Sequence, residues 1–267
     1  MTVPLSADAR RLAEIAHEAG RIILDHYAEG APARLKDDRS PVTAADEEAE
    51  ALILERLAES WPDVPVIAEE AVAGGTIPKI GRRFFLVDPL DGTKEFLARN
   101  GEFTVNIALI EDGVPVLGMV LAPAKERLFL GDLTGAAPVA VEAAAPTDYP
   151  AHLDHARRLR ARPAPKDGLI AVASRTHRDK KTEEYLARYP IKDFIAAGSS
   201  LKFCLIAAGE ADIYPRHGRT MEWDTAAGHA VLAAAGGTLT GLDGEAFLYG
   251  KWNKGFANPF FVARGAA

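Results

Sequence analysis

The chain has 267 residues, of which 48% are hydrophobic and 26% are charged, and its formal net charge is −7. This composition is typical of a soluble globular chain that is long enough for one large core or for two subdomains. It excludes collagen-like, disordered and small disulfide-stapled proteins. The excess of 38 acidic over 31 basic side chains argues against a surface for polymeric nucleic acid, but not against a small anionic substrate bound by local groups.

The cysteine content and the apolar runs predict the compartment. The single cysteine, Cys204, lies in an apolar run and cannot form an internal disulfide, so we expect a buried thiol in a reducing, cytoplasmic setting. The first ten residues lack a basic stretch followed by an apolar core. No run approaches the ~18 apolar residues that a membrane span needs, so we expect no integral membrane segment.

The first half of the chain reads as helices packed on a mostly antiparallel sheet. Apolar periodicity predicts helices over residues 7–30 and 44–60, separated by the polar segment 36–43. Strands are predicted over residues 65–68, 83–87, 103–110, 114–121 and 127–131. The turn Glu111-Asp112-Gly113 joins the third and fourth strands as a hairpin.

The second half reads as alternating strands and helices. Residues 141–167 are rich in Ala, Pro and Arg without a clear period, and we place a subdomain boundary there, between 1–140 and 141–267. The arginines in this stretch are interpreted as a solvated helix face: Arg157, Arg158, Arg160 and Arg162. Beyond it, strands are predicted over 169–173, 192–196 and 211–214, and helices over 179–188, 199–208 and 224–235. This alternation predicts a mixed or parallel sheet with helices on its faces, and the whole chain a layered α/β fold.

The segment Asp88-Pro89-Leu90-Asp91-Gly92-Thr93 follows a strongly apolar strand. Such a strand delivers two carboxylates at its carboxyl end, where open α/β folds place ligands. Pro89 stiffens the chain, and Gly92 allows a tight turn that can point the amides of Gly92 and Thr93 at an anion. A capped turn at the start of a helix explains the same residues, so the segment alone leaves both readings open.

Further acidic residues follow other predicted elements. Glu69 and Glu70 come directly after a strand, and Asp224 begins a predicted helix. Carboxylates brought together from three element ends would bind a hard cation such as Mg²⁺. Each position also has a structural reading, as a charged loop or as an N-cap, and Thr43-x-x-Asp46 fits a capping box.

Taken together, these segments carry a family resemblance. They are, in chain order, Thr43-Ala44-Ala45-Asp46, Glu69-Glu70, Asp88 to Thr93 and Trp223-Asp224-x-Ala226-x-Gly228. In order and separation they resemble the signatures of the lithium-sensitive, Mg²⁺-dependent inositol monophosphatase superfamily, and the match covers nearly the whole chain. The resemblance implies an αβαβα sandwich with an antiparallel-sheet N-terminal part and a mixed-sheet C-terminal part.

Within the superfamily, the similarity is greatest to the 3'(2'),5'-bisphosphate nucleotidases of CysQ type, which implies a role in sulfur metabolism. The segments that carry this similarity are Asp91 to Phe96, Asn100 to Ile107, Gly198 to Cys204 and Tyr214-Pro215-Arg216.

The resemblance implies a ligand set for two or three Mg²⁺ ions per site. Glu69, Asp88 and the main-chain carbonyl of Leu90 would hold the activating ion. Asp88, Asp91 and Asp224 would hold a second ion, with Asp88 shared between the two.

The resemblance also implies roles in the reaction. Thr93, hydrogen-bonded to Asp46, would orient the attacking water and pass its proton towards the carboxylate, with Glu69 acting beside them. The transferred phosphate would lie on the amides of Gly92 and Thr93. Glu70 would reach a third, looser ion through water.

For the nucleotide, the resemblance implies a second set of residues. Ser199, Lys202 and Arg216 would receive the 5'-phosphate that is kept, with Asp224 also beside the substrate. Ser199 can supply an N-cap hydroxyl, Lys202 lies one turn further on, and the guanidinium of Arg216 suits a phosphate. Ser174-Arg175-Thr176-His177 resembles a family segment near the nucleotide, and we assign it no definite role.

The resemblance therefore implies an enzyme that hydrolyses the 3'-phosphate of adenosine 3',5'-bisphosphate to AMP and phosphate, without a covalent intermediate. One alternative is an inositol monophosphatase or fructose 1,6-bisphosphatase activity, and a second is a non-catalytic, metal-dependent nucleotide sensor. Lys202 and Arg216 favour a bisphosphate, and the presence of both Asp46 and Thr93 favours catalysis. The sequence leaves the oligomeric state open between monomer and homodimer.

Overall fold

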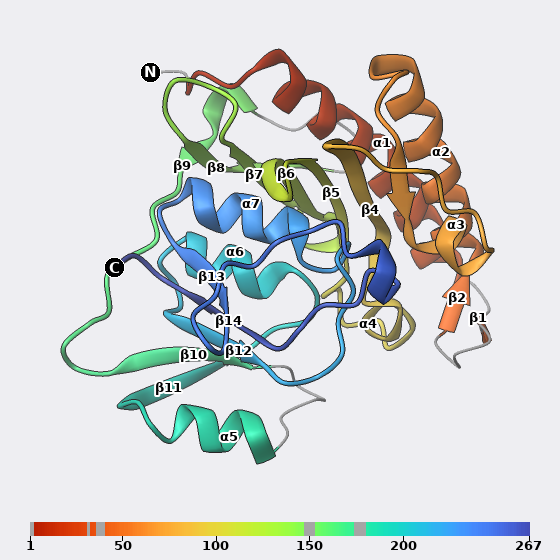
Figure 1. Cartoon of the computed structure of the whole chain (residues 1–267). Helices are drawn as coiled ribbons and strands as arrows, with labels where there is room; N and C mark the ends of the chain where they lie inside the picture. Colours follow the sequence, from red (N-terminus) through yellow and green to blue (C-terminus); the bar gives the residue numbers. More distant parts are fainter. Residues whose placement is uncertain (1–2, 31–32, 36–40, 147–152, 174–179) are drawn as a thin grey trace.

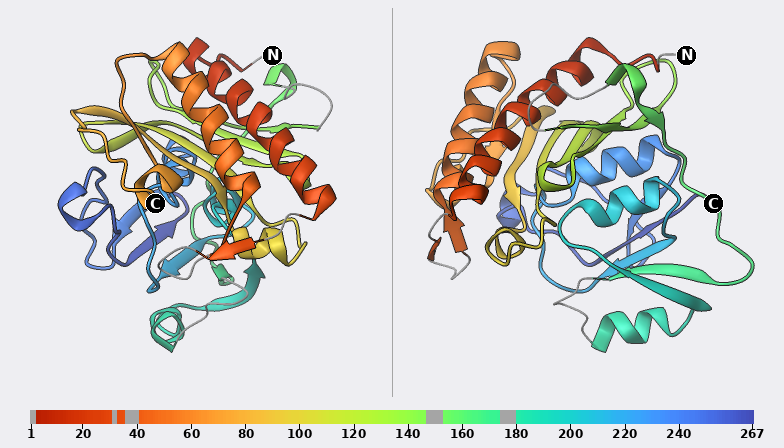
Figure 2. Two further views of the ribbon diagram at one scale, coloured as in Figure 1. Left: turned by 90° about the vertical axis from the view of Figure 1, so that its right-hand side faces the viewer. Right: turned by 180° about the vertical axis from the view of Figure 1, so that it is seen from behind.

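The computed structural model describes residues 3–30, 33–35, 41–146, 153–173 and 180–267. Its elements stack in five layers of helices and sheets (Figure 1), which the view from behind shows edge-on (Figure 2). The predicted αβαβα sandwich is thus confirmed. The segments 36–40 and Ser174 to His177, considered in the sequence analysis, lie outside the described residues.

The first layer is a pair of long helices, α1 (Ala7–Glu29) and α2 (Ala44–Ser60). The hydroxyl oxygen of Ser6 accepts a hydrogen bond from the Ala9 amide at 3.1 Å and so caps the start of α1. Gly30 ends this helix in the left-handed conformation, with φ of 81°. The apolar faces of α1 and α2 pack against each other and on the sheet below, as the periodicity predicts. A short hairpin, β1 (Ala33–Leu35) and β2 (Pro41–Thr43), leads into α2.

The second layer is a seven-stranded sheet in the order β3-β4-β5-β6-β7-β8-β9. Its strands are β3 (Val66–Ala68), β4 (Arg83–Asp91), β5 (Thr104–Glu111), β6 (Val114–Ala122), β7 (Arg127–Asp132), β8 (Val139–Ala144) and β9 (Arg157–Arg158). The pair β3 and β4 is parallel and the other pairs are antiparallel, including the predicted β5–β6 hairpin. Two short helices follow strands of this sheet, α3 (Glu69–Ala73) after β3 and α4 (Thr93–Leu97) after β4.

The sequence missed the last two strands of this sheet, which fall in or next to the stretch read as irregular. The prediction of a helix face over the arginines is wrong, because Arg157 and Arg158 form β9 at the sheet edge. Arg157 pairs with Glu142 across the strands, and Arg162 pairs with the buried Asp212. Neither strand shows a period-2 pattern, because β8 has only one charged residue among Val and Ala, and β9 consists of two arginines.

The third layer is formed by α6 (Leu201–Ala207) and α7 (Ala226–Ala234), and the fourth is a mixed sheet in the order β11-β10-β12-β14-β13. Its strands are β10 (Leu169–Ala173), β11 (Ile191–Ala196), β12 (Ile213–Arg216), β13 (Thr238–Gly241) and β14 (Phe261–Arg264). The strands β11, β10 and β12 are parallel, and β14 is antiparallel to both of its neighbours. Helix α5 (Lys180–Leu186) covers the outer face of this sheet as the fifth layer.

Helix α7 lies close against the first sheet because β6 and β7 carry glycine beneath it. Gly118 and Gly131 are direct cross-strand partners. A Cβ at Gly118 would lie 2.5 Å from the Cβ of Ala230, and a Cβ at Gly131 would lie 2.4 Å from the carbonyl oxygen of the same residue. These two positions therefore determine how closely α7, and the turn that precedes it, approaches the sheet.

None of the described helices is both long and apolar enough to cross a membrane.

We predict that Gly118→Ala and Gly131→Ala each lower the free energy of unfolding by about 1–3 kcal/mol, because the added methyl group pushes α7 away from the sheet. Gly135→Ala is the matched control, since this glycine is exposed and a Cβ there would have no neighbour closer than 3.8 Å. Urea unfolding followed by circular dichroism measures all three. Equal stability of the three variants would contradict the close packing of α7.

Candidate active site

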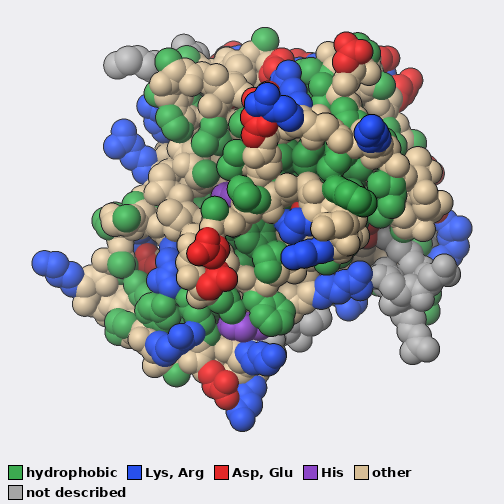
Figure 3. Space-filling model, in the orientation of Figure 1, with side chains coloured by type: hydrophobic (Ala, Val, Ile, Leu, Met, Phe, Trp, Pro, Cys, Tyr) green, Lys and Arg blue, Asp and Glu red, His purple; other side chains and the backbone are tan. Residues whose placement is uncertain are grey.

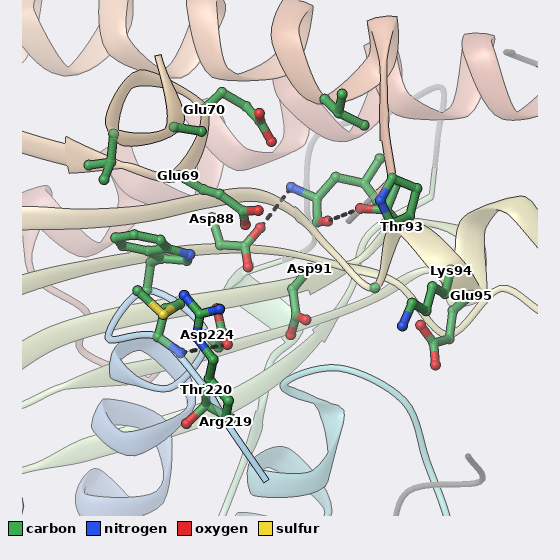
Figure 4. Close-up of a pocket in the computed structure, with 18 of the residues that line it drawn as sticks. Glu69, Glu70, Asp88, Asp91, Thr93, Lys94, Glu95, Arg219, Thr220 and Asp224 are labelled. Atoms are coloured by element: carbon green, nitrogen blue, oxygen red, sulfur yellow. Dashed lines mark hydrogen bonds between the residues drawn. The ribbon is translucent and has the colours of Figure 1, made fainter. Parts of the chain in front are cut away.

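A β-bulge brings Asp88 and Asp91 to the same side of β4. Residues three apart in a regular strand point to opposite faces. Here Asp88 pairs with Asn106 and Asp91 with Thr104, so three steps along β4 match two along β5, and the register shifts by one residue. Pro89 lies in the bulge, where its missing N–H removes no ladder hydrogen bond. The bulge therefore turns the two predicted ligands of this strand toward one cavity (Figure 4).

The parallel pairing of β3 and β4 places Glu69 beside Asp88. Ala68 is aligned with Val87, so the next residue of each strand is acidic. The buried carboxylate of Glu50 on α2 accepts hydrogen bonds from the amides of Glu70, at 2.8 Å, and Ala71, at 2.7 Å. Glu50 thus fixes the turn that carries Glu69 and Glu70, a role that the sequence analysis did not predict.

Asp224 lies in a turn before α7 rather than at the start of the helix itself, which begins at Ala226. Its Oδ2 accepts a hydrogen bond from the Met221 amide at 2.8 Å. Two residues earlier, the fully buried Glu222 accepts from the amides of Gly250 and Lys251, at 2.8 and 2.9 Å. The turn is therefore held rigidly to the segment after β13.

The start of α3, the bulge of β4 and the turn before α7 bring together a carboxylate cluster. Oxygens of Glu69, Asp88 and Asp224 lie within 4.8 Å of one another. Burial raises the pKa of Asp88 and of Asp224 well above its usual range, and the neighbouring carboxylates raise it further. Only oxygen ligands are present, and their mutual repulsion would be relieved by a hard divalent cation, so the donor set fits a metal such as Mg²⁺.

Asp91 is not a member of this cluster, although it lines the same cavity. One of its oxygens accepts a hydrogen bond from the amide of Asn106 at 3.4 Å. Burial raises the pKa of Asp91 to about 6. Asn106 is a further site residue that the sequence analysis did not single out, and its position opposite the bulge is a consequence of the strand register.

Asp46 makes both of the contacts that the sequence analysis considered, the capping box and the hydrogen bond to Thr93. Its Oδ2 accepts from the backbone amide of Thr43 at 2.8 Å, as in a capping box. Its Oδ1 accepts from the hydroxyl of Thr93 at 3.2 Å. The Thr93 hydroxyl also lies 3.4 Å from the carbonyl oxygen of Leu90 (Figure 4). The structure therefore brings Asp46, Thr93 and Leu90 to the acidic cluster.

Gly92 is required at the turn between β4 and α4. Its φ is 94°, a backbone conformation that residues other than glycine rarely adopt. A Cβ there would also lie 2.3 Å from the hydroxyl oxygen of Ser199. The first helix residue after it is Thr93, as the sequence predicts.

A smaller cavity of about 140 Å³ adjoins the acidic cavity of about 910 Å³, and the two share Asp91 and Asp224 in their walls. Lys202 and Arg216 line the smaller cavity. The ammonium of Lys202 is buried and donates to the carbonyl oxygen of Ser199 at 2.7 Å, and burial lowers its pKa to about 8. The Nε atom of Arg216 is buried and has no hydrogen-bond partner among the described residues.

The prediction that Ser199 caps a helix with its hydroxyl is wrong. Helix α6 begins at Leu201, with Ser200 as its N-cap residue. The Ser199 hydroxyl oxygen lies 2.7 Å from the carbonyl oxygen of Asp91 and 2.9 Å from that of Glu102. Ser199 therefore links the segment before α6 to the end of β4, and its backbone has a positive φ of 50°.

Comparison with known proteins places the chain in a family. The model of the inositol monophosphatase family matches residues 8–264. The 3'(2'),5'-bisphosphate nucleotidase CysQ of Escherichia coli K12 is 41% identical over 253 residues, which are 94% of this chain and 97% of that protein. Its counterpart in Salmonella typhimurium is 42% identical over 254 residues, with the same coverage.

Solved structures agree. CysQ from Bacteroides thetaiotaomicron, a bacterial member of the inositol monophosphatase family, superposes with a TM-score of 0.79 at 37% identity over 98% of both chains. A Thermotoga maritima IMPase has the same fold, with a TM-score of 0.75 at 23% identity over 95% of this chain and 90% of that chain. The chain belongs to the inositol monophosphatase family, a family of metal-dependent phosphatases, and the resemblance identified from the sequence is confirmed.

The buried charge of Asp91 makes the stability of the metal-free protein dependent on pH. Because burial raises its pKa from 3.8 to about 6, the folded state holds the proton more tightly than the unfolded state. Stability is then greatest below the unfolded pKa and is lost as the pH rises through the folded pKa. In EDTA, we expect Asp91→Asn to gain roughly 2–3 kcal/mol over the parent between about pH 4 and pH 7.

Urea unfolding of both proteins at the two pH values measures this difference. Saturating Mg²⁺ at neutral pH should reverse it by stabilising the parent more than the variant, because bound ligand stabilises the folded state. A difference between parent and variant that is independent of both pH and Mg²⁺ would contradict a buried carboxylate at a cation site.

Proposed function

We propose that the chain is a Mg²⁺-dependent phosphomonoesterase that hydrolyses the 3'-phosphate of adenosine 3',5'-bisphosphate to AMP and phosphate. The observation that carries this proposal is the junction of an acidic cavity with a smaller one to which Lys202 and Arg216 bring positive charge. The first suits the phosphate that is cleaved, and the second suits a phosphate that is kept. Relatives that cover nearly the whole chain are named for action on such a bisphosphate.

We propose that two or three Mg²⁺ ions bind at the acidic cavity. Its ligands would be Glu69, Asp88, the carbonyl oxygen of Leu90, Asp91 and Asp224. When bound, the ions supply positive charge that polarises the attacking water and neutralises the phosphate. Glu70 lines the same cavity and would reach a third ion through water.

In the reaction, Thr93 and Asp46 would direct the water. The Thr93 hydroxyl donates a hydrogen bond to the buried carboxylate of Asp46. The hydroxyl oxygen of Thr93 is then oriented to accept a hydrogen bond from water. The oriented water attacks the phosphorus and passes a proton towards the carboxylate, while the bond from phosphorus to the 3'-oxygen breaks and that oxygen takes up a proton from solvent water. The amides of Gly92 and Thr93 would hold the phosphate oxygens during this displacement.

Lys202 and Arg216 would bind the 5'-phosphate. Both residues line one small cavity, the ammonium of Lys202 is buried, and the Nε of Arg216 has no hydrogen-bond partner among the described residues. On the face seen in Figure 3, other Lys and Arg side chains lie singly or in small groups among apolar and acidic ones, so the attraction for a phosphate has to come from local groups. We propose that Ser199 contributes through its backbone, since its hydroxyl is already bonded.

Residues 1–140 would then supply most of the metal ligands, and residues 141–267 would supply Asp224 and the nucleotide contacts. We further propose that the enzyme works in the cytoplasm, where its buried free thiol, Cys204, stays reduced.

We predict that Lys202→Ala and Arg216→Ala each lower kcat/KM for adenosine 3',5'-bisphosphate by about ten- to more than a hundredfold, the value of a charge-assisted hydrogen bond. The same changes should have little effect on 3'-AMP, which lacks the 5'-phosphate. Phosphate release from both substrates measures the contrast. Equal losses on the two substrates would remove both residues from the recognition of the second phosphate.

A further inference from the structure

The two cavities share part of their walls, and this shared region forms the junction between them. Six residues line both of them: Asp91, Gly92, Glu95, Arg216, Thr220 and Asp224. In the proposed function, on which this inference rests, one phosphate occupies each cavity. The ribose joins the two phosphates of the nucleotide, so the sugar lies at this junction.

Two of the six shared residues, Glu95 and Thr220, have no role in binding a metal or a phosphate in the proposed function. Thr220 is buried, and its hydroxyl accepts a hydrogen bond from the Asn258 amide at 3.3 Å. Glu95 is half-buried, and its carboxylate makes no hydrogen bond or ion pair within the part of the chain that the structure describes. An ionised carboxylate can only accept hydrogen bonds, so at this junction it suits a donor group of the substrate rather than a phosphate.

The backbone on both sides leaves room for this carboxylate. Glu95 extends from α4 into the pocket (Figure 4). A Cβ at Gly198 would lie 3.1 Å from the Cγ of Glu95, and a Cβ at Gly92 would lie 3.3 Å from its Oε2. The side chain is therefore held between two glycines, beside the turn proposed to bind the cleaved phosphate.

We propose that Glu95 accepts a hydrogen bond from the free ribose 2'-hydroxyl next to the cleaved 3'-phosphate, and so selects ribonucleotide 3',5'-bisphosphates over their deoxy analogues. A hydroxyl is the donor that the sugar offers at this point. The carboxylate of Glu95 would also repel a nucleotide that carries a phosphate group in place of this hydroxyl. A site built to bind a hydroxyl discriminates against the analogue that lacks it, because the polar group is then left unpaired.

The test compares adenosine 3',5'-bisphosphate with its 2'-deoxy analogue in the parent, Glu95→Ala and Glu95→Gln. We expect the parent to prefer the ribonucleotide in kcat/KM by about ten- to a hundredfold. In Glu95→Ala the preference should fall to within about threefold, through loss on the ribonucleotide alone. Glu95→Gln, which is close in shape and keeps one acceptor oxygen, should lie between the two and guards against a folding defect.

Four results would overturn the proposal. Equal losses on both substrates in Glu95→Ala would indicate a structural role, and a higher Mg²⁺ concentration for half-maximal activity would make Glu95 a metal ligand. A parent that cleaves both substrates equally well would show that the hydroxyl is not recognised, while the proposed function would stand. A parent that cleaves neither would overturn both proposals.

Discussion

The structure depends on holding several carboxylates together in a partly buried cavity, where they repel one another. Oxygens of Glu69, Asp88 and Asp224 lie within 4.8 Å, and burial with mutual repulsion raises the pKa of Asp88 and Asp224. Without a cation, folding this cluster is unfavourable, because taking charge out of water is costly. A hard divalent ion converts the same geometry into a binding site, so the function of the chain rests on an arrangement that weakens its metal-free fold.

The surrounding structure supplies the rigidity that this arrangement needs. A one-residue bulge in β4 turns Asp88 and Asp91 the same way. Two buried carboxylates fix the other ligand segments by accepting hydrogen bonds from backbone amides. Glu50 holds the start of α3 after β3, and Glu222 holds the turn before α7. Each turn comes from a different element of the sandwich. The ligand cluster therefore forms only when the layers are correctly packed, which is why the close approach of α7 to the glycines of β6 and β7 bears on the site.

The sequence predicted the elements with strong periodicity and the motifs that end them. Helix α2 has the predicted bounds, and the acidic residues Glu69, after β3, and Asp88, in β4, meet as expected. It missed β8, which is rich in alanine, and β9, an edge strand of two arginines. The bulge in β4, and the side to which it turns the two aspartates, could be known only from the register with β5. The long-range partners of Ser199 and Glu50 were also invisible, because a hydrogen bond between residues distant in the chain has no local pattern.

The central claim is that the acidic cavity and the adjoining cavity with Lys202 and Arg216 together select a nucleotide with two phosphates. The most direct test is phosphate release by the purified protein from adenosine 3',5'-bisphosphate, its 2',5' isomer, inositol 1-phosphate and fructose 1,6-bisphosphate, with Mg²⁺ and with EDTA. The account predicts that kcat/KM is highest for adenosine 3',5'-bisphosphate and that EDTA abolishes turnover. Preference for inositol 1-phosphate, or turnover that persists in EDTA, would contradict it.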